Sequence, residues 1–184
     1  AVAFDDGTGP AVYLGPTSAN AAPLPMAKFD GMAVTQVGDP IRKKAVTSGS
    51  SSLWVAHLGV HTLGDVPTLF AGGLFAGTDA VPTRGLLEWD NTNWTSFGPL
   101  GGVSQPAALP FLFSATDPTV VDIAAFDLDG TGPAPEAMLI AGEFSKSGSV
   151  TTGGLSARVN GEWSDVGGGV PNAIRYSQIY VDSS

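Results

Sequence analysis

Three sequence anchors return in the same order along this chain, and this repeat limits the fold more than any other feature. The first anchor is an apolar run followed by an acidic, glycine-rich turn. It occupies residues 2–10 and returns at residues 123–133, with a degenerate copy at residues 61–67. Repeats of this kind are the signature of architectures that stack one supersecondary unit. The chain is therefore expected to contain several copies of a single unit.

The other two anchors describe strands. The second is an apolar strand that ends at a glycine, and its copies are residues 11–15, 68–72 and 137–142. The third is a hairpin followed by a short strand that closes on a glycine, and its copies are residues 26–38, 86–98 and 155–167. Asp-Gly and Asn-Gly pairs supply the positive φ angles that tight hairpins need. Each copy therefore reads as four β-strands.

The anchors also keep their spacing. The closing glycines Gly38, Gly98 and Gly167 lie 60 and 69 residues apart, and the strand-ending glycines Gly15, Gly72 and Gly142 lie 57 and 70 residues apart. The longer second interval is explained by an insertion near residues 106–118. A four-stranded unit of this length is closest to a β-propeller blade, since kelch-type blades span about 50 residues and WD-type blades about 40–45.

The predicted fold is therefore all-β: a β-propeller arc of three four-stranded blades plus the first strand of a fourth. The blades are expected at approximately 1–52, 53–118 and 119–174, with 175–184 beginning a further blade. A β-sandwich is the alternative. Because a closed propeller has about four to eight blades, either blades are missing from a longer chain or two copies close a six-bladed ring.

Residues 4–10, followed by an apolar strand to glycine and then by a Trp-Asp hairpin and a tryptophan strand, resemble the degenerate propeller repeats of large secreted bacterial proteins. These repeats are similar to kelch and galactose-oxidase-like blades. The resemblance covers nearly the whole chain and implies a propeller in an extracellular setting. It implies no particular activity. The first copy departs from the pattern because it lacks a tryptophan in its last strand, and the second lacks the full acidic turn.

Composition narrows the function classes. Eight Lys and Arg residues stand against seventeen Asp and Glu residues, a net charge of −9. Such a surface repels phosphate backbones, so nucleic-acid binding is disfavoured. The absence of cysteine excludes disulfides, thiolate metal sites and a cysteine nucleophile. No apolar run approaches the length of a transmembrane helix, and the start at Ala1 suggests a processed protein or a fragment.

One acidic turn resembles half of a calcium loop. Asp127, Asp129 and Thr131 lie two residues apart, and Glu136 could add a further oxygen ligand. Calcium prefers six to eight oxygen ligands from such closely spaced side chains and backbone carbonyls. An ordinary hairpin turn is the alternative interpretation, and no other cofactor is predicted.

The remaining candidates favour packing over chemistry. His57 and His61 lie four residues apart, but on a predicted strand and not on a helix, so they do not form a zinc pair of the helical kind. No Gly-x-Ser-x-Gly elbow is present, so no Ser-His-Asp triad can be assigned. The four tryptophans could stack on sugar rings, but their positions in the repeat favour contacts between blades; they are Trp54, Trp89, Trp94 and Trp163.

The sequence therefore predicts a non-enzymatic module for adhesion, assembly or recognition outside a bacterial cell. Its expected partner is a protein, or a second copy that closes the propeller. Two alternatives stay open. One is a propeller that binds or acts on carbohydrate, with a glycan as ligand, and the other is a structural half-propeller that closes by oligomerisation.

Overall fold

The computed structural model describes most of the chain, namely residues 1–18, 23–42, 53–63, 66–97, 102–104, 118–127, 132 and 136–170. Within these residues, sixteen strands form four antiparallel sheets, which confirms the predicted all-β class. This part of the chain contains no helix long and apolar enough to cross a membrane. The expected fourth-blade strand at 175–184 and most of the insertion at 106–118 lie outside the described residues.

Three of the sheets contain the repeated unit, each as four consecutive antiparallel strands. Unit 1 consists of β1 (Val2–Asp5), β2 (Pro10–Leu14), β4 (Leu24–Phe29) and β5 (Val34–Ile41). Unit 2 consists of β6 (Leu53–Leu63), β7 (Val66–Leu74), β8 (Leu86–Trp89) and β9 (Trp94–Ser96). Unit 3 consists of β11 (Thr119–Phe126), β12 (Ala137–Glu143), β15 (Leu155–Val159) and β16 (Glu162–Asp165).

Short strands join neighbouring units. Strand β3 (Thr17–Ser18) comes from the segment between β2 and β4 but pairs with β6, at the edge of unit 2. Strands β10 (Val103–Ser104), β13 (Lys146–Ser147) and β14 (Val150–Thr151) form a small sheet that links the connection after β9 to unit 3. Neither cross-connection follows from the repeat pattern.

The three units share one pairing register. In the last hairpin of each unit one residue pair occupies the corresponding place, and these pairs are Phe29 with Val34, Trp89 with Trp94, and Arg158 with Trp163. Their partners on the second strand also correspond, and these are Val12, Leu69 and Met138. We call residues at the same place in this register repeat-equivalent. The expected equivalence of Trp94 with Trp163, and of Trp89 with Phe29, is confirmed.

Local turn chemistry explains the hairpins. The Asp30 carboxylate accepts hydrogen bonds from the backbone N–H groups of Met32 and Ala33, both at 2.8 Å. Asp90 accepts the corresponding bonds in unit 2, at 2.9 and 2.6 Å. In unit 3 the turn is Asn160-Gly161, where both residues have positive φ, 51° and 84°. Asp and Asn side chains that bond to the following backbone favour such turns.

Two glycines correct the predicted strand ends. The second anchor predicts strands that end at Gly72 and Gly142, but β7 continues to Leu74 and β12 to Glu143. The first strand of each of these units carries a bulge, between Val55 and His57 and between Val120 and Asp122. A side chain on Gly73 would overlap the Trp54 carbonyl, and one on Gly142 would overlap the Thr119 carbonyl. Glycine is therefore needed for the backbones to approach at the bulge.

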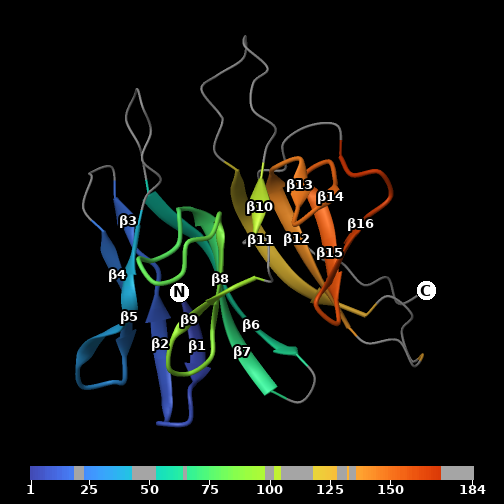
Figure 1. The fold of residues 1–184 in the computed structure, drawn as a ribbon. Helices are drawn as coiled ribbons and strands as arrows, with labels where there is room; N and C mark the ends of the chain where they lie inside the picture. Colours follow the sequence, from blue (N-terminus) through green and yellow to red (C-terminus); the bar gives the residue numbers. More distant parts are fainter. Residues whose placement is uncertain are drawn as a thin grey trace.

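The units lie side by side in chain order, from blue through green to orange (Figure 1). Two separate apolar cores fill the spaces between them. The first joins units 1 and 2 and includes Tyr13, Met26 and Trp94; the second joins units 2 and 3 and includes Phe70 and Ile140. Each sheet therefore has two faces, a back face toward the preceding unit and a forward face toward the next one.

Candidate functional site

The acidic turn of unit 1 is occupied by its own hydrogen bonds. Asp5 accepts bonds from the backbone N–H groups of Gly7 and Gly9, at 2.9 and 3.0 Å. Asp6 accepts a bond from the Tyr13 hydroxyl at 2.7 Å, and the Lys28 ammonium lies 2.8 Å from both of its carboxylate oxygens. A lysine ammonium thus occupies the position that a cation would take between these groups.

Hydrogen bonds keep the Asp6 carboxylate of this turn ionised. Burial acts to raise the pKa of Asp6, but bonds from Lys28, Thr8 and Tyr13 outweigh it and hold that pKa well below the usual range. Burial and the neighbouring carboxylate raise the pKa of the Tyr13 phenol. Asp6 is therefore a fixed anion paired with a fixed cation, an arrangement that stabilises a turn and offers no acid or base near neutral pH.

The predicted calcium loop belongs to unit 3 and is described in part. Asp127 follows the end of β11 and Glu136 precedes the start of β12, so the two lie on either side of the connection between these strands. Asp129 and Thr131 lie outside the described residues. Within the described part of the chain, no three His, Asp or Glu side chains come together as a group that could hold a metal ion. Calcium binding here stays a prediction.

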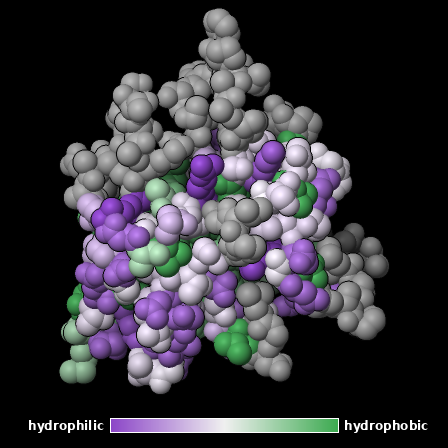
Figure 2. Space-filling model, in the orientation of Figure 1, coloured by the Kyte–Doolittle hydropathy of each residue, from purple (hydrophilic) through white to green (hydrophobic). Residues whose placement is uncertain are grey.

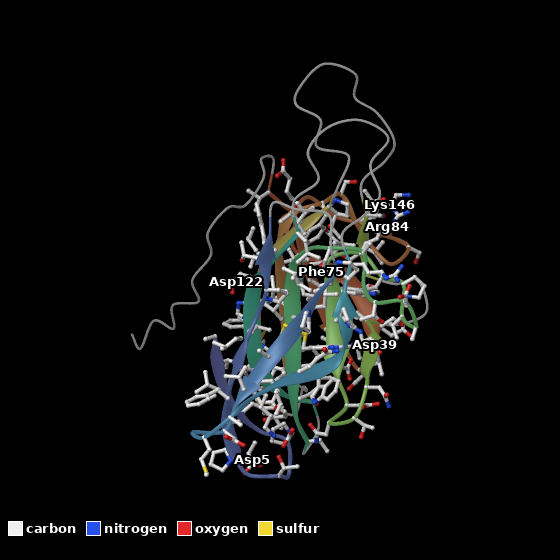
Figure 3. The ribbon with its side chains drawn as sticks, turned by 90° about the vertical axis from the view of Figure 1, so that its left-hand side faces the viewer. Asp5, Asp39, Phe75, Arg84, Asp122 and Lys146 are labelled. Atoms are coloured by element: carbon white, nitrogen blue, oxygen red, sulfur yellow. The ribbon has the colours of Figure 1, made fainter. Side chains whose placement is uncertain are left out.

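A polar cluster joins the first strands of units 2 and 3. His57 Nδ1 lies 2.8 Å from Asp122 Oδ1, and both residues directly follow the bulge of their strand, so they are repeat-equivalent. His61, on the same strand as His57, has its Nε2 atom 3.1 Å from the Ile123 carbonyl oxygen. The two imidazole rings are nearly parallel, with centroids 6.3 Å apart. Asp122 lies far from the turn at Asp5 (Figure 3).

The chemistry of this cluster favours neutral histidines. Burial lowers the pKa of His57, more strongly than the Asp122 carboxylate raises it. Burial also lowers the pKa of His61. The Nε2 atom of His57 is buried without a hydrogen-bond partner, so neither solvent nor a reacting group reaches it. The cluster joins two sheets, so His57 and His61 take part in the packing between units 2 and 3.

The sequence did not identify Asp122 as the partner of His57, because the two residues lie far apart in the chain and no motif connects them. Only the bulge, which places both residues at one height on neighbouring sheets, brings them together. A second polar contact joins the same two units: Arg158 Nη1 lies 4.0 Å from Glu88 Oε2. The Arg158 guanidinium also lies over the rings of Phe97 and Trp163. Burial raises the pKa of Glu88. Units 2 and 3 therefore share two polar contacts across an apolar interface.

Two tryptophans of unit 2, Trp89 and Trp94, pack in the apolar core between units 1 and 2. Trp89 and Trp94 are 6% and 3% exposed, and the Trp94 indole N–H donates to the Val37 carbonyl of unit 1 at 3.3 Å. Trp54 is 39% exposed. A depression of about 490 Å³ beside the acidic turn of unit 1 is lined by seven residues, Thr8, Gly9, Pro10, Lys28, Asp30, Met32 and Thr35. It presents no aromatic ring for a sugar to stack on.

Unit 1 carries an exposed apolar surface. Val12, Leu14, Phe29 and Val34 lie on its back face and are between 39% and 66% exposed. Hydrophobic surface is visible along the left-hand edge of the molecule, over the β4–β5 hairpin (Figure 2). Contiguous apolar surface of this kind commonly marks a site of protein–protein contact.

Comparison of the chain with models of protein families, with curated proteins and with solved structures gave no significant match.

Proposed function

We propose that the three units are successive blades of a β-propeller arc. The observation that carries this proposal is the shared register: three consecutive four-stranded units have equivalent pairs in their last hairpins, and each packs face to face on the next. Blades that stack radially through their faces, with the first strand innermost, have these features. The cluster of His57 and Asp122 would then lie on the innermost strands.

In this proposal the chain is a non-enzymatic module for adhesion, assembly or recognition in an extracellular setting. The titratable groups nearest to a catalytic arrangement are already engaged. Asp6 is held by Lys28, and His57 is held by Asp122 with its second nitrogen buried. The exposed apolar side chains on the back face of unit 1 suit a protein partner better than a small substrate.

The blade arrangement is tested by distances between spin labels. Because the chain has no cysteine, the substitutions Thr35→Cys, Thr95→Cys and Ser164→Cys can be combined in pairs at repeat-equivalent sites. An arc predicts two similar neighbour distances and an end-to-end distance clearly shorter than their sum. An end-to-end distance equal to the sum would indicate a straight stack and would contradict the propeller.

The role is tested by ligand profiling of the purified chain. A glycan array should show no saturable binding. Binding that is lost in the Trp54→Ala variant would instead support the carbohydrate-binding alternative, since Trp54 is the most exposed tryptophan whose exposure the structure gives.

A further inference from the structure

Two histidines of unit 2 contact unit 3 across the second apolar core. His57 Nδ1 lies 2.8 Å from Asp122 Oδ1, and His61 Nε2 lies 3.1 Å from the Ile123 carbonyl oxygen. Both histidines belong to β6, and both partners belong to β11, the first strand of unit 3. The two polar contacts therefore join the first strands of the two units beside an apolar core.

Both imidazole rings lie close to Gly59, which stands between the two histidines on β6. An added Cβ on Gly59 would lie 2.4 Å from His57 Nε2 and 2.8 Å from His61 Nε2. The missing side chain therefore lets the two Nε2 atoms approach each other, with the ring planes only 9° apart. Neutral rings tolerate this arrangement, whereas two imidazolium ions would repel each other.

The surroundings of both histidines disfavour a positive charge. Burial lowers the pKa of His57 more strongly than the Asp122 carboxylate raises it, and His61 and the amino group of Ala1 lower it further. Burial also lowers the pKa of His61, and it outweighs the carbonyl that this ring contacts and the carboxylates of Glu136 and Asp122. Among the described residues, His57 Nε2 has no hydrogen-bond partner and is buried, so a proton on it would be a donor without an acceptor.

We propose that units 2 and 3 are joined by an acid-sensitive contact, which opens when His57 and His61 become protonated. An open contact lets water reach both rings, and imidazolium ions are more stable in water than in a buried site. The sheet faces that separate carry Phe70, Leu86 and Ile140, each 0% exposed in the closed structure. Opening therefore uncovers a second apolar surface in mild acid. This device goes beyond the proposed function and requires only that units 2 and 3 pack together.

Other ionisable groups at the two cores oppose this opening or keep their charge. Burial raises the pKa of Glu88, whose Oε2 lies 4.0 Å from Arg158 Nη1, so protonation of Glu88 favours the closed contact. At the first core, hydrogen bonds outweigh burial and hold the pKa of Asp6 well below its usual range, while burial and Asp6 raise that of Tyr13. A histidine protonated only in the open state raises the open population by up to about tenfold between about pH 7.5 and 5.5.

The experiment introduces one thiol into each core of this cysteine-free chain. Val120→Cys reports on the second core, because Val120 Cγ1 would lie 2.7 Å from an added Cβ on Gly72 of unit 2. Val37→Cys is the matched control in the first core, and the two valines are 0% and 5% exposed. The labelling rate with dithiodipyridine, which reacts with thiols in mild acid, is divided by that of the urea-unfolded chain at the same pH. When closing is faster than labelling, this ratio measures the open population.

From about pH 7.5 to 5.5 the ratio for Val120→Cys should rise about tenfold or more. At about pH 5.5 it should exceed the ratio for Val37→Cys by about tenfold or more and depend less on urea, because a local opening exposes less surface than global unfolding. Glutamine at both His57 and His61 should abolish the rise at Val120→Cys.

Three results would overturn the proposal. The first is equal ratios and equal urea slopes at the two thiols, which would mean that both react only through global unfolding. The second is a ratio for Val120→Cys that does not change with pH. The third is a rise that survives the double replacement of His57 and His61. The comparison of the two thiols retains both histidines, so it decides the matter even when a glutamine variant does not fold.

Discussion

Gly38, which lies beside the rings of Trp89 and Trp94, allows a direct test of how units 1 and 2 pack together. Gly38 and Gly167 follow the equivalent residues Val34 and Trp163 at the same interval, and they have nearly the same φ, 61° and 63°. They differ in surroundings: an added Cβ on Gly38 would lie 2.7 Å from ring atoms of Trp89 and Trp94, whereas one on Gly167 meets nothing of the described chain within 4 Å. Substituting alanine at each position therefore separates backbone strain from steric overlap.

Both variants incur the left-handed backbone penalty, about 1–2 kcal/mol for a residue with a Cβ. Gly38→Ala also overpacks the interface, which typically costs about 1–3 kcal/mol because the tryptophan rings must shift. We expect Gly38→Ala to lower the free energy of unfolding by about 2–5 kcal/mol and Gly167→Ala by about 1–2 kcal/mol. For a chain of this size, each kcal/mol corresponds to about 2–4 °C in Tm.

The assay is urea unfolding followed by tryptophan fluorescence and circular dichroism, at a protein concentration below any association. Tryptophan fluorescence responds to changes around Trp89 and Trp94, because the rings of both lie next to Gly38. Equal destabilisation by the two substitutions would refute the reasoning, because the overlap with the tryptophans would then contribute nothing.

Three further predictions concern charges. Burial lowers the pKa values of His57 and His61 in the folded chain. Below about pH 6.5, the ordinary pKa of a histidine, the unfolded chain therefore binds more protons than the folded one, and the free energy of unfolding falls as the pH drops. In urea unfolding between about pH 7.5 and 5.5, a variant with glutamine at both positions should show a free energy of unfolding that depends less on pH. Lys28→Met leaves the Asp6 carboxylate without its cation and should lower the free energy of unfolding by about 1–3 kcal/mol at pH 7, a loss that an unchanged urea midpoint would contradict. If the turn after β11 binds calcium, a chelator should lower the Tm of the wild type but not that of Asp127→Asn, and equal Tm values with and without chelator would remove the site.

The hairpin turns show how much local chemistry the sequence carries. Asp30 and Asp90 bond to the backbone two and three residues later, and Asn160-Gly161 supplies two positive φ angles. These interactions involve neighbours in the chain, so the residue types alone predict the turns. The same reasoning predicts the strands on either side of these turns. It also predicts the equivalence of Trp94 with Trp163, which depends on their spacing from the turns.

Strand ends were less predictable than strand existence. The backbone of the first strand approaches closely, opposite its bulge, at Gly142 of the second anchor and at Gly73, the residue after the anchor glycine Gly72. A glycine that ends a strand and one that admits a bulge look alike in sequence, because both satisfy the need for a missing side chain.

The sequence by itself determined the repeat, the all-β class and the alternation that gives a strand an apolar face. The tertiary structure alone decided which of those faces are covered, and it brought His57 to Asp122 and Gly38 to Trp94. Alternation has a period of two whatever lies above the sheet, so the sequence pattern is the same for Val34, which is 66% exposed, and for Trp94, which is 3% exposed. Contacts between sheets join residues far apart in the chain, and only the packing of whole units fixes them.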